Sequence, residues 1–88
     1  MADIQKLTVY IVDDDDLVLQ TIMAMTRALG HDVLSFSSGV EFLDALPELA
    51  QGALLLDVRM PRIDGLAVLE QVRQLWPNAP VIMMSGQG

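Results

Sequence analysis

The chain has 88 residues, a formal net charge of −7 and 52% hydrophobic residues, which together predict one small domain with an apolar core. An acidic surface repels phosphate backbones, so we expect this segment to bind no nucleic acid. The chain has no cysteine, which excludes disulfides and thiolate chemistry and is typical of the cytoplasm, where we expect the protein. No apolar stretch approaches the roughly 20 residues that cross a bilayer, so we expect no membrane contact.

Short apolar runs alternate with amphipathic segments along the chain. The predicted strands cover residues 7–12, 32–36, 53–56 and 81–84. The predicted helices cover residues 16–29, 39–47 and 66–76. Continuous apolar strands separated by helices indicate a parallel sheet with helices on both faces, so the predicted fold is α/β in the order β-α-β-α-β-α-β.

Apolar residues spaced by three and four predict which side of each helix is buried. The predicted buried faces are, in chain order, Val18, Ile22, Met25 and Leu29; then Val40, Leu43 and Leu46; then Leu66, Leu69, Val72 and Trp76. Ser38 and Glu41 form a capping-box pattern, which places the start of the second helix near Gly39. Gly30 and Pro47 are typical of helix ends.

Polar side chains follow three of the predicted strands. Asp13 and Asp14 come after the first strand, Asp57 after the third and Ser85 after the fourth. The carboxyl ends of parallel strands share one edge of a sheet, so three carboxylates converge there if the first and third strands are neighbours. Such a cluster is costly, and Mg²⁺ would relieve it. A carboxylate beside Mg²⁺ can attack phosphorus to form an aspartyl phosphate, and a hydroxyl at Ser85 could then bind a phosphoryl oxygen.

Three stretches carry a family resemblance: VYIVDDDD, LLLDVRMPRIDG and VIMMSG resemble the signature segments of response regulator receiver domains. The resemblance runs from about residue 7 to 86. It implies a flavodoxin-like sheet, Mg²⁺ as cofactor, a sensor histidine kinase as partner, and a signalling domain that assists its own phosphotransfer and dephosphorylation rather than an enzyme. The pattern D-V-R-M-P-x-x-D-G-L is similar to regulators with a C-terminal DNA-binding domain, which implies a transcription factor parent.

The resemblance also implies a role for each site residue. Asp57 matches the phosphoacceptor, and Ser85 matches the switch hydroxyl. Asp14 matches the acid that binds Mg²⁺ directly, and Asp13 the acid that reaches it through water. Arg59 matches the position whose backbone carbonyl completes the metal site, so an arginine side chain is tolerable there.

Receiver domains continue beyond their fourth strand with a further helix, a fifth strand that bears a lysine and a last helix. The resemblance therefore implies that residues 1–88 are a partial receiver domain, truncated after the fourth strand. The strand at 81–84 would then lie at an edge of the sheet, with apolar side chains and unpaired backbone groups. Such an edge is a template for another chain, so we expect self-association through it.

Two other functions stay open from the sequence. Without the lysine, the chain could be a phosphorylation-incompetent fragment that only self-associates. A phosphohydrolase of the haloacid dehalogenase type also uses a strand-end aspartate, and Asp13 and Asp15 have its D-x-D spacing; Leu17, however, stands where threonine or valine is expected. In a purely structural interpretation, Asp13 and Asp14 would only cap the first helix.

Overall fold

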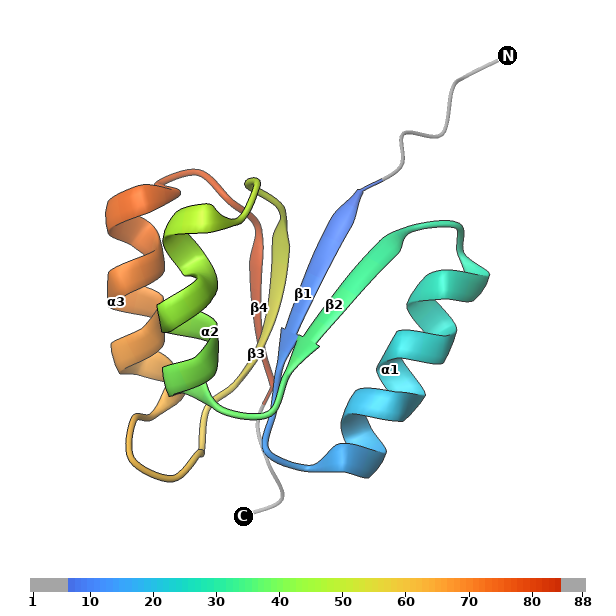
Figure 1. Ribbon diagram of the computed structural model, residues 1–88, viewed down its shortest axis with the longest axis horizontal. Helices are drawn as coiled ribbons and strands as arrows, with labels where there is room; N and C mark the ends of the chain where they lie inside the picture. The colour runs from blue at the N-terminus through green and yellow to red at the C-terminus, as the bar shows by residue number, and fades with distance from the viewer. Residues whose placement is uncertain (1–6, 85–88) are drawn as a thin grey trace.

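The computed structural model describes residues 7–84 (Figure 1). Strands and helices alternate along this part of the chain. In order they are β1 (Thr8–Val12), α1 (Asp16–Ala28), β2 (Asp32–Phe36), α2 (Gly39–Ala45), the 3₁₀ turn η1 (Leu46–Glu48), β3 (Ala53–Asp57), α3 (Gly65–Leu75) and β4 (Val81–Met84). The predicted element order is confirmed, with bounds that differ by two residues at most. Within residues 7–84, no helix is both long and apolar enough to cross a membrane.

The sheet is parallel, with the strand order β2-β1-β3-β4. This is the flavodoxin-like arrangement that the sequence predicted. The chain passes from β1 out to β2 on one side and then returns to β3 on the other, so the strand order reverses between β1 and β3. Val12 lies opposite Leu56 in this central pair. Because ligands of open α/β sheets sit at such a reversal, beyond the carboxyl ends of the strands, this edge is the place to look for a site.

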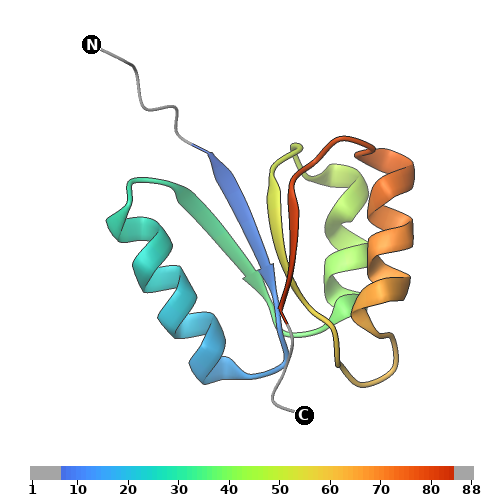
Figure 2. The same cartoon turned by 180° about the vertical axis from the view of Figure 1, so that it is seen from behind.

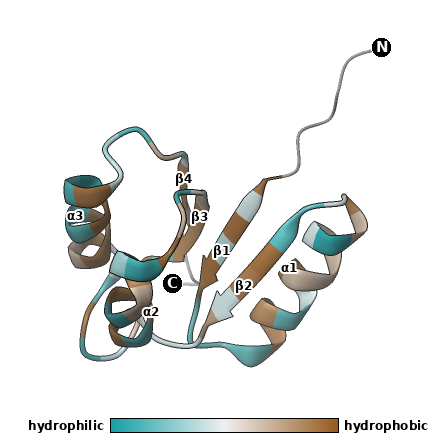
Figure 3. Ribbon diagram, turned by 45° about the horizontal axis from the view of Figure 1, so that its top comes forward, coloured by the Kyte–Doolittle hydropathy of each residue, from teal (hydrophilic) through white to brown (hydrophobic). Residues whose placement is uncertain are grey.

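Helices cover the two faces of the sheet unequally. Helices α2 and α3 stand side by side on one face, and α1 stands on the other (Figures 1 and 2). The strands between them are largely apolar, and the hydrophilic residues concentrate on the helices and turns (Figure 3).

The face under α2 and α3 is closed by aromatic packing, and we call it the aromatic face. Tyr10 on β1 lies with its ring centroid 6.2 Å from that of Phe42 and 5.5 Å from that of Trp76. Its hydroxyl donates a 2.6 Å hydrogen bond to the carbonyl of Ala50. The buried residues of this face are Tyr10, Val12, Phe42, Leu46, Leu54, Leu56, Val68, Val72, Trp76 and Ala79. This cluster is the main core of the domain.

The face under α1 is covered only in part. Val9, Ile11, Leu19 and Val33 are buried between α1 and the β1–β2 half of the sheet. Over the β3–β4 half, a groove of about 210 Å³ remains, which we call the open groove. It is lined by Val9, Thr26, Leu29, His31, Ala53, Leu54, Leu55, Pro80 and Ile82. Ile82 on β4 is 62% exposed beside it.

The predicted buried face of α1 is wrong in its second half. Met25 and Leu29 are 62% and 72% exposed, whereas Leu19 and Thr26 are buried. The hydroxyl of Thr26 donates to the carbonyl of Ile22, which satisfies the polar group inside the helix. Over its second half, α1 therefore turns a different side to the sheet than the apolar spacing indicated.

The predicted faces of α2 and α3 are also partly wrong. Phe42 is fully buried while Val40 is exposed, and Val68 is fully buried while Leu66 is 59% exposed. Val72 is buried as predicted. Each helix carries apolar residues on more than one side, so contact with the sheet, rather than spacing alone, selects the buried one.

Candidate functional site

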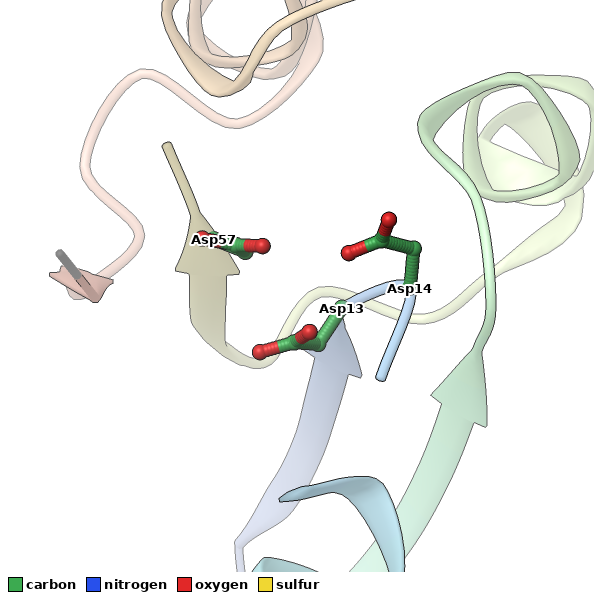
Figure 4. Close-up of side chains that lie close together, drawn as sticks. All are labelled: Asp13, Asp14 and Asp57. Carbon is green, nitrogen blue, oxygen red and sulfur yellow. The ribbon is translucent and has the colours of Figure 1, made fainter. Parts of the chain in front are cut away.

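Three carboxylates meet at the carboxyl end of the sheet. Asp13 directly follows β1, and Asp57 is the last residue of the neighbouring strand β3. One carboxylate oxygen from each of Asp13, Asp14 and Asp57 lies within 4.8 Å of the other two (Figure 4). Asp13 and Asp57 are buried, and Asp14 is exposed. The structure thus brings together the three acids that the sequence placed at one edge.

The crowding of the three acids affects the pKa of Asp13. Burial raises the pKa of its carboxyl, and the negative charges of Asp57, Asp14 and Asp15 raise it further. One contact acts in the opposite direction: the backbone N–H of Asp15 donates a 2.9 Å hydrogen bond to Asp13 Oδ1, which lowers this pKa. A divalent cation would offset the repulsion, and a set of carboxylate oxygens suits Mg²⁺. The three acids therefore fit the cofactor that the resemblance implies.

The first helix is capped by a different acid. Asp15 is the N-cap of α1, and its Oδ1 accepts hydrogen bonds from the backbone N–H groups of Leu17 and Val18 at 2.9 and 3.4 Å. Asp13 and Asp14 are therefore not needed to cap α1. Their side chains stay available at the end of the sheet.

Asp57 is held at the junction of β3 and its loop. Its Oδ1 accepts a 3.3 Å hydrogen bond from the backbone N–H of Arg59. Gly65 begins α3 directly behind it, and a Cβ at Gly65 would collide with the backbone carbonyl of Asp57. Glycine at this position thus lets the helix start against the end of the strand. The metal-binding role of the Arg59 carbonyl stays a prediction.

Ser85 lies outside the described residues, so its role as switch hydroxyl also stays a prediction. The last described residue, Met84, lies opposite Asp57 in the parallel pair of β3 and β4.

A second feature at this end of the sheet was not predicted. A recess of about 290 Å³ opens beside the acid cluster and shares Asp14 with it. We call it the polar recess, and its lining residues are Asp14, Ser37, Ser38, Glu41, Pro61 and Arg62. The sequence offers nothing that singles out Arg62, since a lone arginine in a loop is common.

A family comparison agrees with this geometry. The model of the response regulator receiver domain matches residues 9–88. The chain belongs to this family. The receiver domain family replaces the haloacid dehalogenase alternative for this chain.

Relatives of this receiver domain are response regulators. It is 43% identical over 84 residues to the response regulator protein TmoT of Ectopseudomonas mendocina, and the match covers 96% of the chain and 38% of TmoT. It is 41% identical to the DNA-binding transcriptional regulator NtrC of Klebsiella pneumoniae, over 92% of the chain and 17% of NtrC. The full-length FixJ structure from B. japonicum superimposes with a TM-score of 0.84 and 33% identity, over 97% of the chain and 42% of FixJ. The chain thus spans less than half the length of each of these proteins.

Proposed function

We propose that Asp57 accepts a phosphoryl group from a sensor histidine kinase, with Mg²⁺ held by Asp13, Asp14, Asp57 and the backbone carbonyl of Arg59. The observation that supports this most is the meeting of three carboxylates within 4.8 Å at the end of the central strands. Membership of the receiver domain family of two-component systems supports the same role.

Asp57 is better suited to attack phosphorus than its two neighbours. Asp13 has a raised pKa and uses Oδ1 to accept the N–H of Asp15. Asp14 is exposed at the flank of the cluster. Within residues 7–84, the N–H of Arg59 donates to Asp57 Oδ1, and we assign the second oxygen of this carboxylate as the nucleophile.

The transfer step follows from this placement. The free Asp57 oxygen attacks phosphorus and forms the new O–P bond while the P–N bond to the kinase histidine breaks. The electron pair leaves with the imidazole nitrogen. Bound Mg²⁺ supplies charge neutralisation at the phosphoryl oxygens. We propose that the hydroxyl of Ser85 donates to one of those oxygens in the phosphorylated protein and so acts as the switch hydroxyl.

We propose that the domain controls a DNA-binding effector and acts in the cytoplasm. The relative NtrC is a DNA-binding transcriptional regulator, and this supports a DNA-binding effector in the parent protein. Phosphotransfer from a kinase of this kind would take place in the cytoplasm. The domain is a signalling module that assists its own phosphorylation and dephosphorylation.

Incubation with acetyl phosphate and Mg²⁺ tests the proposal. Intact-mass measurement should show one added phosphoryl group that survives acid and is lost in base, as an acyl phosphate is. Asp57→Asn should abolish it, and so should EDTA. A folded wild-type chain that gains no mass would contradict the proposal and favour the phosphorylation-incompetent alternative.

We also propose that two copies associate through β4. In the described part of the chain β4 is an edge strand, with Ile82 62% exposed next to the open groove. A strand edge beside uncovered apolar surface favours pairing with a second strand. Light scattering at micromolar concentration should report a dimer, and Ile82→Lys should give a monomer that remains folded. A monomeric wild-type chain would contradict this second proposal and leave the first intact.

A further inference from the structure

The loop between β3 and α3 contains a strained turn at Arg62. Arg62 has φ = 73°, and it is the one non-glycine residue with positive φ among residues 7–84. The backbone N–H of Ile63 donates to the carbonyl of Pro61 at 2.8 Å, which closes a γ-turn around Arg62. A left-handed backbone is unfavourable for arginine, so the surrounding loop must hold it in place.

Contacts on the C-terminal side of the turn hold this conformation. Ile63 points inward, since a Cβ built on Gly39 would lie 2.7 Å from Ile63 Cγ2. Asp64 is the N-cap of α3, and its Oδ1 accepts a 2.9 Å hydrogen bond from the N–H of Ala67. With its following neighbours packed and capped in this way, the Arg62 backbone is fixed at the wall of the polar recess.

Arg62 is the cation among the residues that line the polar recess. Glu41, an acid of the same recess, is engaged locally: Ser37 Oγ donates to its Oε1 at 3.4 Å, and its N–H donates to Ser38 Oγ at 3.0 Å. Asp14 is shared with the acid cluster and would be engaged there by Mg²⁺. Arg62 thus carries the positive charge among these lining residues and is the one of them that can attract an anion.

The carboxylate of Asp57 faces Asp14, which borders this recess. Figure 4 shows the carboxylates of Asp57 and Asp14 pointing toward one another across the site. In an in-line transfer the leaving group lies opposite the attacking oxygen. A leaving group displaced by Asp57 therefore departs on the side of Asp14, which borders the polar recess.

We propose that Arg62 selects the phosphodonor by binding the carboxylate leaving group of acyl phosphates. This rests on the proposed phosphoacceptor role of Asp57. The planar guanidinium fork matches a carboxylate with two parallel hydrogen bonds. An acyl phosphate has such a group, because its P–O bond breaks and the electron pair leaves with the carboxylate. Phosphoramidate has none: its P–N bond breaks, and its already protonated nitrogen departs as neutral ammonia.

The test compares these two donors on the full chain at fixed Mg²⁺ and ionic strength. Arg62→Asn removes the cation and keeps a residue that tolerates the left-handed turn. It should slow phosphorylation by acetyl phosphate about 3- to 10-fold, the effect of losing one charge-assisted contact, and leave the rate with phosphoramidate unchanged. Arg62→Lys should fall between wild type and Arg62→Asn. Arg27→Asn, which changes the net charge equally but lines a different recess with Gly30 and His31, is the matched control and should change neither rate.

Each other outcome overturns the proposal. Equal loss with both donors would make Arg62 a general electrostatic or structural residue. No change with either donor would remove it from the reaction. A wild-type chain that neither donor phosphorylates would instead overturn the phosphoacceptor role of Asp57, and the donor selection with it. Circular dichroism of each variant separates these outcomes from misfolding, and Arg62→Gly is a second cation-free variant that the turn accepts.

Discussion

The aromatic face and the carboxyl end of the sheet differ in what their residues do for the fold. On the aromatic face, Tyr10, Phe42 and Trp76 are buried in mutual contact. At the carboxyl end, three acids have carboxylate oxygens within 4.8 Å of one another. In the nearby loop, Arg62 adopts a positive φ of 73°. Burial of the rings stabilises the fold in the first region. In the second region, repulsion between like charges and backbone strain destabilise it.

The two regions are linked by short segments of chain. Val12 belongs to the aromatic face, and the next residue, Asp13, belongs to the acid cluster. On the neighbouring strand β3, Leu56 likewise belongs to the aromatic face, and the next residue, Asp57, belongs to the acid cluster. The aromatic face therefore positions the acids and offsets their repulsion. Substitutions in the two regions should change stability in opposite directions, and this contrast can be tested.

The largest effect is expected on the aromatic face. Phe42→Ala removes a fully buried ring and should lower the free energy of unfolding by about 3–5 kcal/mol. Ile82→Ala, a truncation at a 62% exposed position, should change it by no more than about 0.5 kcal/mol in the monomer. Urea denaturation monitored by circular dichroism measures both. Similar losses in the two variants would show that the two faces of the sheet are equally important to stability.

An intermediate effect of opposite sign is expected at the acid cluster. Asp13→Asn removes one of the crowded charges and should stabilise the chain in EDTA by on the order of 1 kcal/mol, the energy of two like charges about 4 Å apart in water. The same substitution should remove most of the increase in Tm that Mg²⁺ gives the wild type. Thermal denaturation with and without Mg²⁺ measures both effects, and a destabilised variant in EDTA would contradict the account.

The raised pKa of Asp13 also predicts the pH dependence of the metal-free protein. Its folded-state pKa lies above the unfolded value of about 3.9. Between these two values the folded state binds more protons than the unfolded state. The contribution of Asp13 to stability therefore falls as pH rises through that window. Wild type minus Asp13→Asn, measured in EDTA from acidic to neutral pH, should show this decline; a difference that is flat or rises with pH would exclude it.

The smallest effect is expected at the strained turn. Arg62→Gly removes the penalty of a left-handed arginine, about 1–2 kcal/mol, but adds the entropy cost of glycine, about 0.5–1 kcal/mol. We expect a net gain of about 0.5–1 kcal/mol by urea denaturation. Arg59→Gly, in the same loop but without positive φ, adds only the entropy cost and should be destabilised. If both variants lose stability, the turn at Arg62 is not strained.

The sequence predicted the acid cluster well because its geometry depends on strand order. Asp13 and Asp57 each follow an apolar strand, and parallel strands bring their carboxyl ends to one edge. Adjacency of β1 and β3 was the one assumption required, and the topology confirms it. The helix starts near Asp16 and Gly39 were predicted for a similar reason, because capping is local.

The sequence did not predict features that depend on packing between elements. Phe42 rather than Val40 is buried because the aromatic rings of Tyr10 and Trp76 lie on that side of α2. Spacing within the helix cannot supply this information. The left-handed turn at Arg62 was missed because no glycine or asparagine marks it. The polar recess was missed because it joins segments that are distant in sequence.

Asp57 is the residue that we expect to become phosphorylated. Treatment with acetyl phosphate and Mg²⁺, followed by borohydride reduction, converts an aspartyl phosphate into homoserine, which peptide mass spectrometry can locate. We expect homoserine at position 57, Mg²⁺-dependent and absent after Asp57→Asn. Homoserine at Asp13 or Asp14 in the wild-type chain, or its persistence at another residue in Asp57→Asn, would contradict it.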